Sequence, residues 1–366
     1  MFFNIIIIIN LFVNVSSYGW LPLLDLKSYK FKQINEIKIL DKNLVVWNKN
    51  NEIIVQDNAC MHRKAPLSEG YIDKNTKNLR CSYHGWEFDT KGNVLSIPQS
   101  YNNCKTCNKK KTCNEFESEY KYKQKTYQTK KAGNILWVNI NDTPNDIPYH
   151  ILNDIDNLSD NVFVVDVPYS MDILLENFFD PAHIPFAHHK LQSERKLASS
   201  VNSSVIEMNN ETLKISFEDN TLNNNNYRNG TMIFHNPCHY ILNNTYPEIF
   251  ISKLHIYCVP ILPFDTRVFI QQEFKNNITK NFFSIIPKWF KHTITQSFFD
   301  SDTMLLYRQE KYLRENNILH NCTRSYITPT SSDYSIHMFH KWKNMYPHKW
   351  SNIINKNNIN ELNRNE

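Results

Sequence analysis

Two short loops, each carrying one cysteine and one histidine, constrain this chain most. One residue separates Cys60 from His62, two separate Cys81 from His84, and 18 residues lie between the two pairs. Thiolates and imidazoles bind zinc or an iron–sulfur cluster. Zinc fingers usually place Cys beside Cys and His beside His, whereas a Rieske [2Fe–2S] cluster holds one iron by two cysteines and the other by two histidines. The mixed pairing therefore favours a Rieske cluster, with structural zinc as the alternative.

The pattern around these loops predicts a small antiparallel β domain. From residue 36 to 138, short β-type runs alternate with turn residues, and 141–160 is polar and contains two prolines, as linkers do. Farther along, strand-like runs are mixed with helical stretches at 171–190 and 287–315. We therefore expect a β domain over 18–145 with a Cys- and Lys-rich insertion at 100–125, an α+β domain over 146–350, and an Asn-rich tail at 351–366.

Length and composition agree with two folded domains and argue against other classes. The chain has 366 residues, 41% of them hydrophobic and 13% aromatic, which is enough apolar material for two cores. Its net charge of +5 comes from scattered lysines, so nucleic-acid binding is not expected. Neither GxGxxG nor GxxxxGK[ST] occurs, which disfavours a nucleotide-phosphate site.

Two further segments leave alternatives open. Residues 1–17 are apolar and too short to span a bilayer, so we expect a cleaved signal-like segment or a membrane-resting anchor. In the insertion, Cys104, Cys107 and Cys113 fit a solvated loop, a zinc or disulfide clip, or a redox-regulatory dithiol.

A second group of metal-binding side chains begins the second domain. Asp180, His183, His188 and His189 lie within ten residues, and Asp300 and Asp302 follow in the long helical segment. Two imidazoles and one carboxylate, with coordination positions left open, bind the iron of non-haem oxygenases. Taken alone, such a cluster is more often a polar surface or a set of core histidines. Together with a Rieske motif it indicates an oxygenase, because an electron carrier and an O₂-activating iron form one catalytic unit.

At this point the sequence resembles Rieske non-haem iron oxygenases, in particular the pheophorbide a oxygenase-like branch of chlorophyll metabolism. The resemblance covers roughly residues 18–345 and is carried by CMHRKAPLSEG from Cys60, RCSYHGWEF from Arg80, and ENFFDPAHIPFAHH from Glu176. It implies an antiparallel β Rieske domain followed by an α+β catalytic domain with a central antiparallel sheet and long helices, of helix-grip or START-like form.

The resemblance also implies a role for each motif residue. Cluster ligands would be Cys60, His62, Cys81 and His84, and the mononuclear iron would be held by His183, His188 and Asp302, since Asp302 rather than Asp300 stands seven residues before Gln309. Asp180 would be the catalytic bridging aspartate, linking a cluster histidine to an iron-ligand histidine across a subunit boundary in a homotrimer. His189, beside a ligand, would support the site without binding iron.

The resemblance implies a mono- or dioxygenase that contains a [2Fe–2S] Rieske cluster and mononuclear Fe(II). Its electrons would come from ferredoxin or a reductase. The expected substrate is a hydrophobic chlorophyll-derived tetrapyrrole, pheophorbide a or chlorophyllide a, in a plastid. Separately from the resemblance, the lack of any other apolar run near 18 residues leads us to expect a body that is soluble or peripherally associated with a membrane. A sterol, quaternary amine or aromatic acid as substrate, and a non-enzymatic Rieske electron-transfer protein, are the alternatives.

Overall fold

The computed structural model describes residues 19–29, 34–99, 122–141, 147, 158–219, 228–246, 251–319 and 325–346. The expected N-terminal segment 1–17, the tail 351–366, and Cys104, Cys107 and Cys113 lie outside these residues. In the rest of the expected insertion, Lys123 forms an isolated β-bridge with Asn93, three residues before strand β9 begins.

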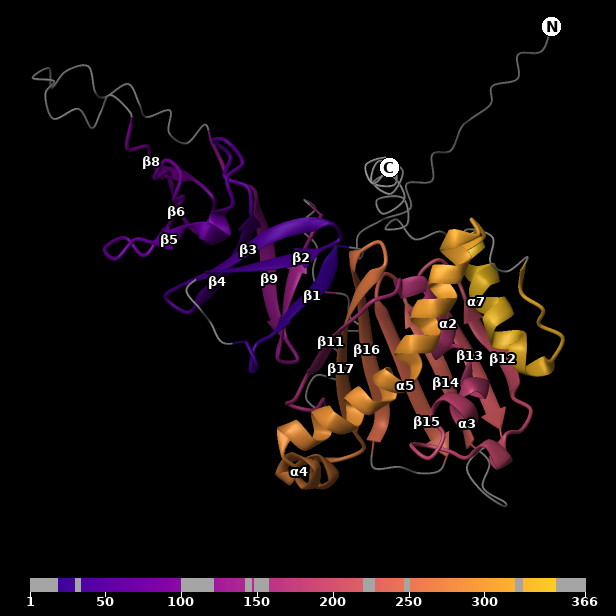
Figure 1. Cartoon of the computed structure of the whole chain (residues 1–366). Helices are drawn as coiled ribbons and strands as arrows, with labels where there is room; N and C mark the ends of the chain where they lie inside the picture. The colour runs from indigo at the N-terminus through magenta and orange to yellow at the C-terminus, as the bar shows by residue number, and fades with distance from the viewer. Residues whose placement is uncertain are drawn as a thin grey trace, which may run out of the picture.

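The first half of the chain forms two antiparallel sheets. One is six-stranded, in the order β1-β10-β9-β4-β3-β2, and the other is four-stranded, in the order β5-β6-β7-β8. Figure 1 shows the smaller sheet at the far left of the molecule. Their strands are β1 (Trp20–Asp25), β2 (Ile34–Ile39), β3 (Lys42–Lys49), β4 (Glu52–Asp57), β5 (Tyr71–Ile72), β6 (Leu79–Arg80), β7 (Glu87–Phe88), β8 (Val94–Ser96), β9 (Thr126–Ala132) and β10 (Ile135–Asn139).

Strand β3 is apolar on both faces and joins two cores. Alternate side chains of a strand point to opposite sides. Leu44 and Val46 therefore enter the larger core of the six-stranded sheet, while Val45 and Trp47 pack with the buried Cys60 and Cys81. The cluster loops consequently rest on a core of their own.

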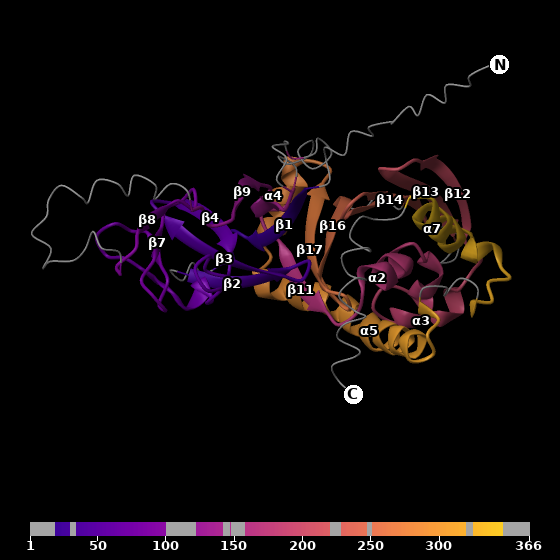
Figure 2. The same ribbon diagram turned by 90° about the horizontal axis from the view of Figure 1, so that it is seen from above.

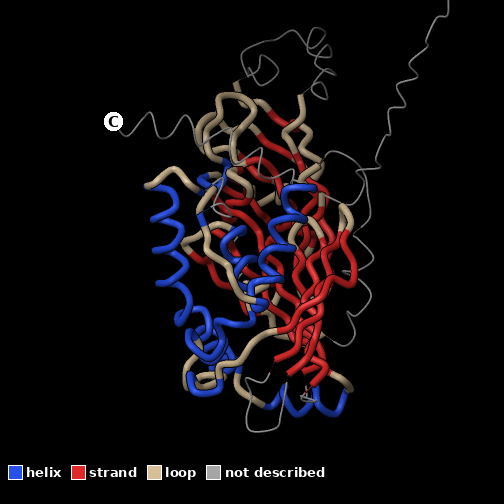
Figure 3. Tube along the Cα trace, turned by 90° about the vertical axis from the view of Figure 1, so that its right-hand side faces the viewer, coloured by secondary structure: helices blue, strands red, loops and turns tan. Residues whose placement is uncertain are grey.

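The second half forms a seven-stranded antiparallel sheet, in the order β11-β17-β16-β15-β14-β13-β12, with helices on one face (Figures 1, 2 and 3). No helix among the described residues is long and apolar enough to cross a membrane. The strands are β11 (Phe163–Val167), β12 (Asn202–Met208), β13 (Thr212–Asp219), β14 (Arg228–His235), β15 (His239–Tyr246), β16 (Ile251–Leu262) and β17 (Asp265–Phe274). The helices are α2 (Met171–Phe178), α3 (Ile184–Ala187), α4 (Asn277–Ile285), α5 (Lys288–Glu315) and α7 (Tyr334–Met345).

Helix α5 packs one stripe of side chains against this half. Its buried residues recur every three or four positions, as the 3.6-residue helical repeat requires, and they are Phe299, Asp302, Leu306, Glu310 and Leu313. The Glu310 carboxylate accepts a hydrogen bond of 3.0 Å from the backbone N–H of Ser170, the residue that caps α2. Helix α5 thus positions both Asp302 and the start of α2.

The opposite face of the seven-stranded sheet packs against the first half. Tyr257 contacts Trp137 edge to face, with ring centroids 5.1 Å apart, in a core that also contains Trp20. Backbone N–H groups of Leu40 and Asp41 donate to carbonyls of residues 260 and 261 at 2.8 and 2.9 Å. The two halves are therefore joined by both apolar packing and backbone hydrogen bonds.

The expected α+β architecture with its antiparallel sheet and one long helix is present, but several elements differ from the sequence expectation. Strands β1, β5, β8, β9, β12 and β15 and helices α4 and α7 were not predicted. The helical stretch expected at 171–190 is broken, because α2 ends before Asp180-Pro181 and a 3₁₀ turn, Pro181–His183, precedes α3. Proline has no N–H to continue a helix but fits its first turn.

Phe179, fully buried where α2 ends, packs between Phe339 and Tyr240 with ring centroids 5.3 and 5.5 Å away. We expect Phe179→Ala to lower the free energy of unfolding by about 3–5 kcal/mol, through the lost transfer energy and the cavity left behind. Urea denaturation would measure this. Phe282→Ala, at a residue that is 63% exposed, is the matched control and should change stability by less than about 0.5 kcal/mol. Equal effects would contradict the packing role.

Candidate metal centres

The two cluster loops have the same backbone geometry. The N–H of Cys60 donates to the carbonyl of Ala65 and the N–H of Lys64 donates to the carbonyl of Cys60, at 2.8 and 2.7 Å. The second loop repeats this pattern, with Cys81 bonded to Trp86 and Gly85 bonded to Cys81, both at 2.9 Å. Lys64 and Gly85 occupy equivalent positions with positive φ, 61° and 73°. Each turn presents one Cys and one His to the same space.

Cysteines and histidines differ in exposure at this site. Cys60 and Cys81 are buried, whereas His62 is exposed and His84 half-buried, and the two imidazole rings lie 4.6 Å apart. Burial raises the pKa of the Cys60 thiol to about 11, opposed by hydrogen bonds from backbone N–H groups of the loop. Two buried thiols and two more exposed imidazoles supply the two-cysteine, two-histidine donor set that a Rieske cluster requires.

Gln124 ties the first cluster loop to the sheet. Its side-chain oxygen accepts a hydrogen bond from the N–H of Met61 at 2.9 Å, and its amide nitrogen donates to the carbonyls of Asp57 and Ala59 at 3.0 and 3.1 Å. Gln124 is only 2% exposed. It lies within the expected insertion, and no pattern in the sequence marks it.

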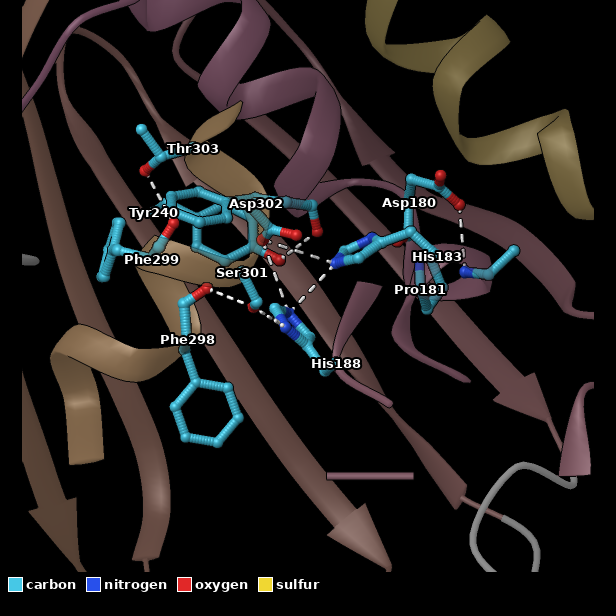
Figure 4. Close-up of polar contacts among 12 residues, drawn as sticks. Asp180, Pro181, His183, His188, Tyr240, Phe298, Phe299, Ser301, Asp302 and Thr303 are labelled. Atoms are coloured by element: carbon cyan, nitrogen blue, oxygen red, sulfur yellow. Dashed lines mark hydrogen bonds and ion pairs between the residues drawn. The ribbon is translucent and has the colours of Figure 1, made fainter. Parts of the chain in front are cut away.

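The second centre combines the loop after α2 with helix α5 (Figure 4). One donor atom from each of His183, His188 and Asp302 lies within 4.8 Å of the others. The two Nε2 atoms are 3.3 Å apart, and Oδ2 of Asp302 lies 3.8 Å from His183 Nε2 and 3.5 Å from His188 Nε2. These three donors alone could hold a small metal ion and leave positions open for other ligands.

Hydrogen bonds fix the histidine tautomers for such a role. His188 Nδ1 lies 2.7 Å from Ser301 Oγ, and the Ser301 hydroxyl donates to the carbonyl of Phe298, so Oγ accepts the Nδ1 proton. His183 Nδ1 faces the backbone carbonyl of Asp180, which is also an acceptor. Both Nε2 atoms therefore carry lone pairs that face each other. A bound cation would remove the repulsion between them.

Burial changes the proton affinity of this site. It lowers the pKa of His183 to about 4 and also lowers the pKa of His188, so both imidazoles are neutral at pH 7, as metal binding requires. Burial raises the pKa of Asp302 to about 7, although a hydrogen bond from Asn177 partly offsets the effect. Without a cation the buried carboxylate is poorly stabilised, and a metal ion would favour its ionised form.

The structure brings Asp302, and not Asp300, to this centre. Two residues along an α-helix correspond to a rotation of about 200°, so Asp300 points to the opposite side. Asp300 is exposed and accepts a hydrogen bond of 2.7 Å from the side chain of Gln296. Ser301, which holds His188, was missed because a lone serine in a helix carries no pattern.

Asp180 and His189 lie beside the metal-binding histidines, and the bridging and supporting roles expected for them stay predictions. One carboxylate oxygen of Asp180 accepts a hydrogen bond from the N–H of Ala182 at 3.0 Å, and its backbone carbonyl, rather than its carboxylate, contacts His183. His189 Nδ1 accepts a hydrogen bond from the N–H of Arg195 at 3.3 Å. In Figure 1 the sheet that carries His84 lies at the opposite end of the molecule from α3.

An ion pair missed from the sequence supports the His183 loop. Arg228 and Asp219, on β14 and β13, pair in the interior, and Arg228 Nη2 donates to the carbonyl of Pro181 at 3.4 Å. A buried charge needs such a partner. The pair thereby anchors the loop to the sheet.

Comparison with known proteins gives two domain matches. Residues 19–116 match the Rieske [2Fe-2S] domain, and residues 234–318 match the pheophorbide a oxygenase domain. Flavonoid 8-hydroxylase 2, chloroplastic, of Ocimum basilicum is 28% identical over 90% of this chain and 65% of its own length. Pheophorbide a oxygenase, chloroplastic, of Oryza sativa subsp. japonica is 28% identical over 83% of this chain and 60% of its own length. A solved fluorene-bound complex of carbazole 1,9a-dioxygenase with ferredoxin shares the fold, with a TM-score of 0.63, 15% identity and 90% coverage of each chain.

The chain thus carries a Rieske [2Fe-2S] domain and a pheophorbide a oxygenase domain, and over most of its length it is similar to relatives named pheophorbide a oxygenase. Its first half is the domain type that binds a Rieske [2Fe–2S] cluster, and its second half contains the His, His and Asp arrangement typical of mononuclear iron. The chain spans less than two thirds of the length of the curated relatives named above.

Gln124→Ala should lower the amount of cluster retained, because it removes the three hydrogen bonds that hold the first loop and leaves the Met61 N–H unsatisfied. The visible absorption and EPR signal of the purified protein, per chain, would measure this. Gln128→Ala, at an exposed glutamine on β9, is the control and should retain the cluster. Full retention in Gln124→Ala would show that the loop does not need this support.

Ser301→Ala should weaken Fe(II) binding at the second centre by about 10- to 100-fold, because the acceptor that orients His188 is lost. Titration of the iron-depleted mononuclear site with Fe(II) would measure the affinity. The control is Ser297→Ala, four residues earlier on α5, whose hydroxyl donates to the Thr293 carbonyl at 2.9 Å. The orienting role fails if both variants bind iron equally.

Proposed function

We propose that this protein is an oxygenase that uses O₂ and externally supplied electrons to oxidise a hydrophobic substrate. One observation carries the proposal: three metal-binding donor atoms from His183, His188 and Asp302 converge in a chain that also has a Rieske domain. When bound, the cluster supplies single electrons and the mononuclear iron activates O₂. A protein serving only as an electron carrier would not need the second centre.

In this proposal the chain's own residues hold and orient the metal groups. Cys60, Cys81, His62 and His84 bind the cluster, with Gln124 fixing the first loop. His183, His188 and Asp302 bind the mononuclear iron through Nε2 and carboxylate oxygen atoms. Ser301 and the Asp180 carbonyl keep the Nδ1 protons away from the metal position.

We propose a chlorophyll-derived tetrapyrrole as the substrate, either pheophorbide a, with ring opening, or chlorophyllide a. Support comes from the matched pheophorbide a oxygenase domain, which contains Asp302, and from the relatives of that name in rice and Arabidopsis thaliana. The long helix crossing the sheet is consistent with a helix-grip or START-like domain. The names of these relatives also support a plastid location.

A second candidate keeps the reaction class and changes the substrate to a smaller aromatic molecule. The flavonoid hydroxylase is as similar to this chain as the rice pheophorbide a oxygenase, at 28% identity each. Flavonoids are flat and apolar, as are tetrapyrroles, but much smaller. A substrate test must therefore include both.

We also propose a homotrimer that receives electrons from ferredoxin or a reductase. In Figure 1 the small sheet next to the cluster loops (labels β5, β6 and β8) and helix α3, next to the histidine loop, lie at opposite ends of the molecule, so short electron transfer requires the cluster of a second copy. Asp180 would lie between them, touching His183 through its carbonyl and leaving one carboxylate oxygen for His84 of the partner subunit. The solved complex with ferredoxin supports this class of electron donor.

Asp302→Ala should reduce the iron content from about three to about two per chain and abolish turnover, while the Rieske EPR signal stays unchanged. Asp300→Ala, two residues away on the exposed side of α5, is the matched control and should keep the full iron content. Iron analysis and EPR would measure both. Wild-type protein with about two irons per chain would contradict the oxygenase proposal in favour of an electron carrier.

Asp180→Asn should leave both metal centres occupied but slow electron transfer between them. Asparagine still caps the Pro181–His183 turn, so the loop should keep its shape, whereas the negative charge is lost. Reduction by ferredoxin followed by rapid freezing would give the rate at which the reduced-cluster EPR signal decays in the presence of O₂ and substrate. An unchanged rate would remove Asp180 from the electron path.

Substrate assignment can be tested with reconstituted protein, reduced ferredoxin and ¹⁸O₂. Parallel incubations would contain pheophorbide a, chlorophyllide a or a flavonoid, and mass spectrometry would detect the label. Labelled tetrapyrrole supports the first candidate, and labelled flavonoid the second. With both metal centres occupied, an absence of label in every incubation would contradict both substrates.

A further inference from the structure

Charged and polar side chains join the two strands that carry the second cluster loop. Strands β6 and β7 flank the loop 81–86, and Arg80 and Glu87 are register partners at its base. Arg80 Nη2 lies 2.5 Å from one carboxylate oxygen of Glu87, and the side-chain amide of Asn78 donates to the other oxygen at 2.8 Å. Glu87 is therefore bonded to two residues on the other side of the loop.

These contacts continue to strand β3 and toward the surface. Lys49 Nζ, at the end of β3, donates to the side-chain oxygen of Asn78 at 2.5 Å. On its other side, Arg80 Nε lies 3.2 Å from a carboxylate oxygen of Asp73. Glu87 is only 3% exposed, so its charge is held in the interior beside a cation, as a buried charge requires. We call the connected set the Glu87 network; its members are Glu87, Arg80, Asn78 and Lys49.

The Glu87 network lies next to the cluster loop, on the reverse side of the strand pair. Leu79 and Phe88 enter the small core that contains Cys81. Alternate residues of a strand point to opposite sides, so their neighbours Arg80 and Glu87 face the other side. Arg80 directly precedes Cys81, at the usual spacing of about 3.8 Å between consecutive Cα atoms. In Figures 1 and 2 the small sheet and α3 lie at opposite ends of the molecule, so these charges are near the cluster and far from the mononuclear centre of the same chain.

We propose that the Glu87 network sets the reduction potential of the Rieske cluster. Reduction adds one negative charge to the cluster, which the Glu87 carboxylate opposes and the cations Arg80 and Lys49 favour. The potential of an iron–sulfur cluster depends on nearby charge, hydrogen bonds and solvent exposure, and salt screens buried charges less than exposed ones. Glu87 thus acts as a positioning residue that lowers the potential, and its partners raise it.

Glu87→Gln removes the negative charge and keeps the size of the side chain, so the midpoint potential of the cluster should rise. A unit charge on the order of 10 Å from a redox centre, at an effective dielectric constant of about 20, changes the equilibrium constant for reduction by about tenfold. This factor corresponds to about 59 mV for a one-electron couple. Redox titration at constant pH and salt, followed by the Rieske EPR signal, would measure the potential. An unchanged potential in a variant that keeps its cluster would overturn the proposal.

Lys49→Gln tests the network with the opposite sign. Loss of this cation should lower the equilibrium constant for reduction by about threefold, less than the Glu87 effect because Lys49 is only half-buried and more strongly screened. Shifts in the same direction for both variants would indicate a loosened loop and contradict control by charge. Glu52→Gln, at an exposed residue at the other end of β4 from the first cluster loop, is the matched control and should leave the potential unchanged.

A combined variant tests the charge balance without leaving a buried cation unpaired. Arg80→Gln together with Glu87→Gln removes one charge of each sign, so the equilibrium constant should stay within about twofold of the wild-type value. A potential as high as that of Glu87→Gln alone would show that charge is not the cause. If Glu87→Gln does not retain a cluster, Lys49→Gln decides the question, because an unchanged or raised potential there would overturn the proposal.

Visible absorption per chain would show whether each variant carries its cluster. The measurements need neither the mononuclear iron nor a substrate. The proposal rests on the Rieske cluster alone, so a failure of oxygenase activity and a failure of control by the Glu87 network are separate results.

Discussion

Burial of one stripe of α5 against the seven-stranded sheet determines the mononuclear centre. Asp302 lies within this otherwise mainly apolar stripe, so the packing that holds the helix also brings a carboxylate into the interior. Its pKa is raised by burial, and its nearest basic groups are two imidazoles that are themselves neutral. The fold therefore buries a carboxylate whose ionised form needs a bound cation to be well stabilised.

The histidine loop meets that carboxylate because several unrelated contacts constrain it. Proline residues stop α2 from continuing, Ser301 on α5 orients His188, and Arg228 on β14 binds the carbonyl of Pro181. Each contact comes from a different part of the chain. The helix and the sheet together therefore preorganise the loop. Because several contacts hold it, the geometry of the site does not depend on any single interaction.

The cluster loops differ from the histidine loop, because hydrogen bonds between residues close in sequence determine most of their shape. Each loop closes a turn with two backbone hydrogen bonds and one residue of positive φ, and each cysteine points into a small apolar core. The two halves of the chain then meet through a shared core, far from either metal centre. This arrangement keeps the relative position of the two sites fixed within one chain, although they lie at opposite ends of it.

By itself, the sequence determined the features that depend on local spacing. The paired Cys and His loops, the alternating strands and the long helix could all be predicted, because the ligand order and the strand and helix periods are properties of neighbouring residues. Strands β1, β12 and β15 were among the strands missed. β1 pairs with β10, which is distant in the chain, whereas β12 and β15 pair with neighbouring strands, and in each case the pairing stabilises the strand more than its own composition does. Asp302 as the partner of His183 and His188 was expected from the resemblance, whereas only the tertiary structure assigned support to Ser301, Gln124 and Arg228 and left the apolar face of α4 exposed. Those contacts join residues far apart in the chain, and no local pattern encodes them.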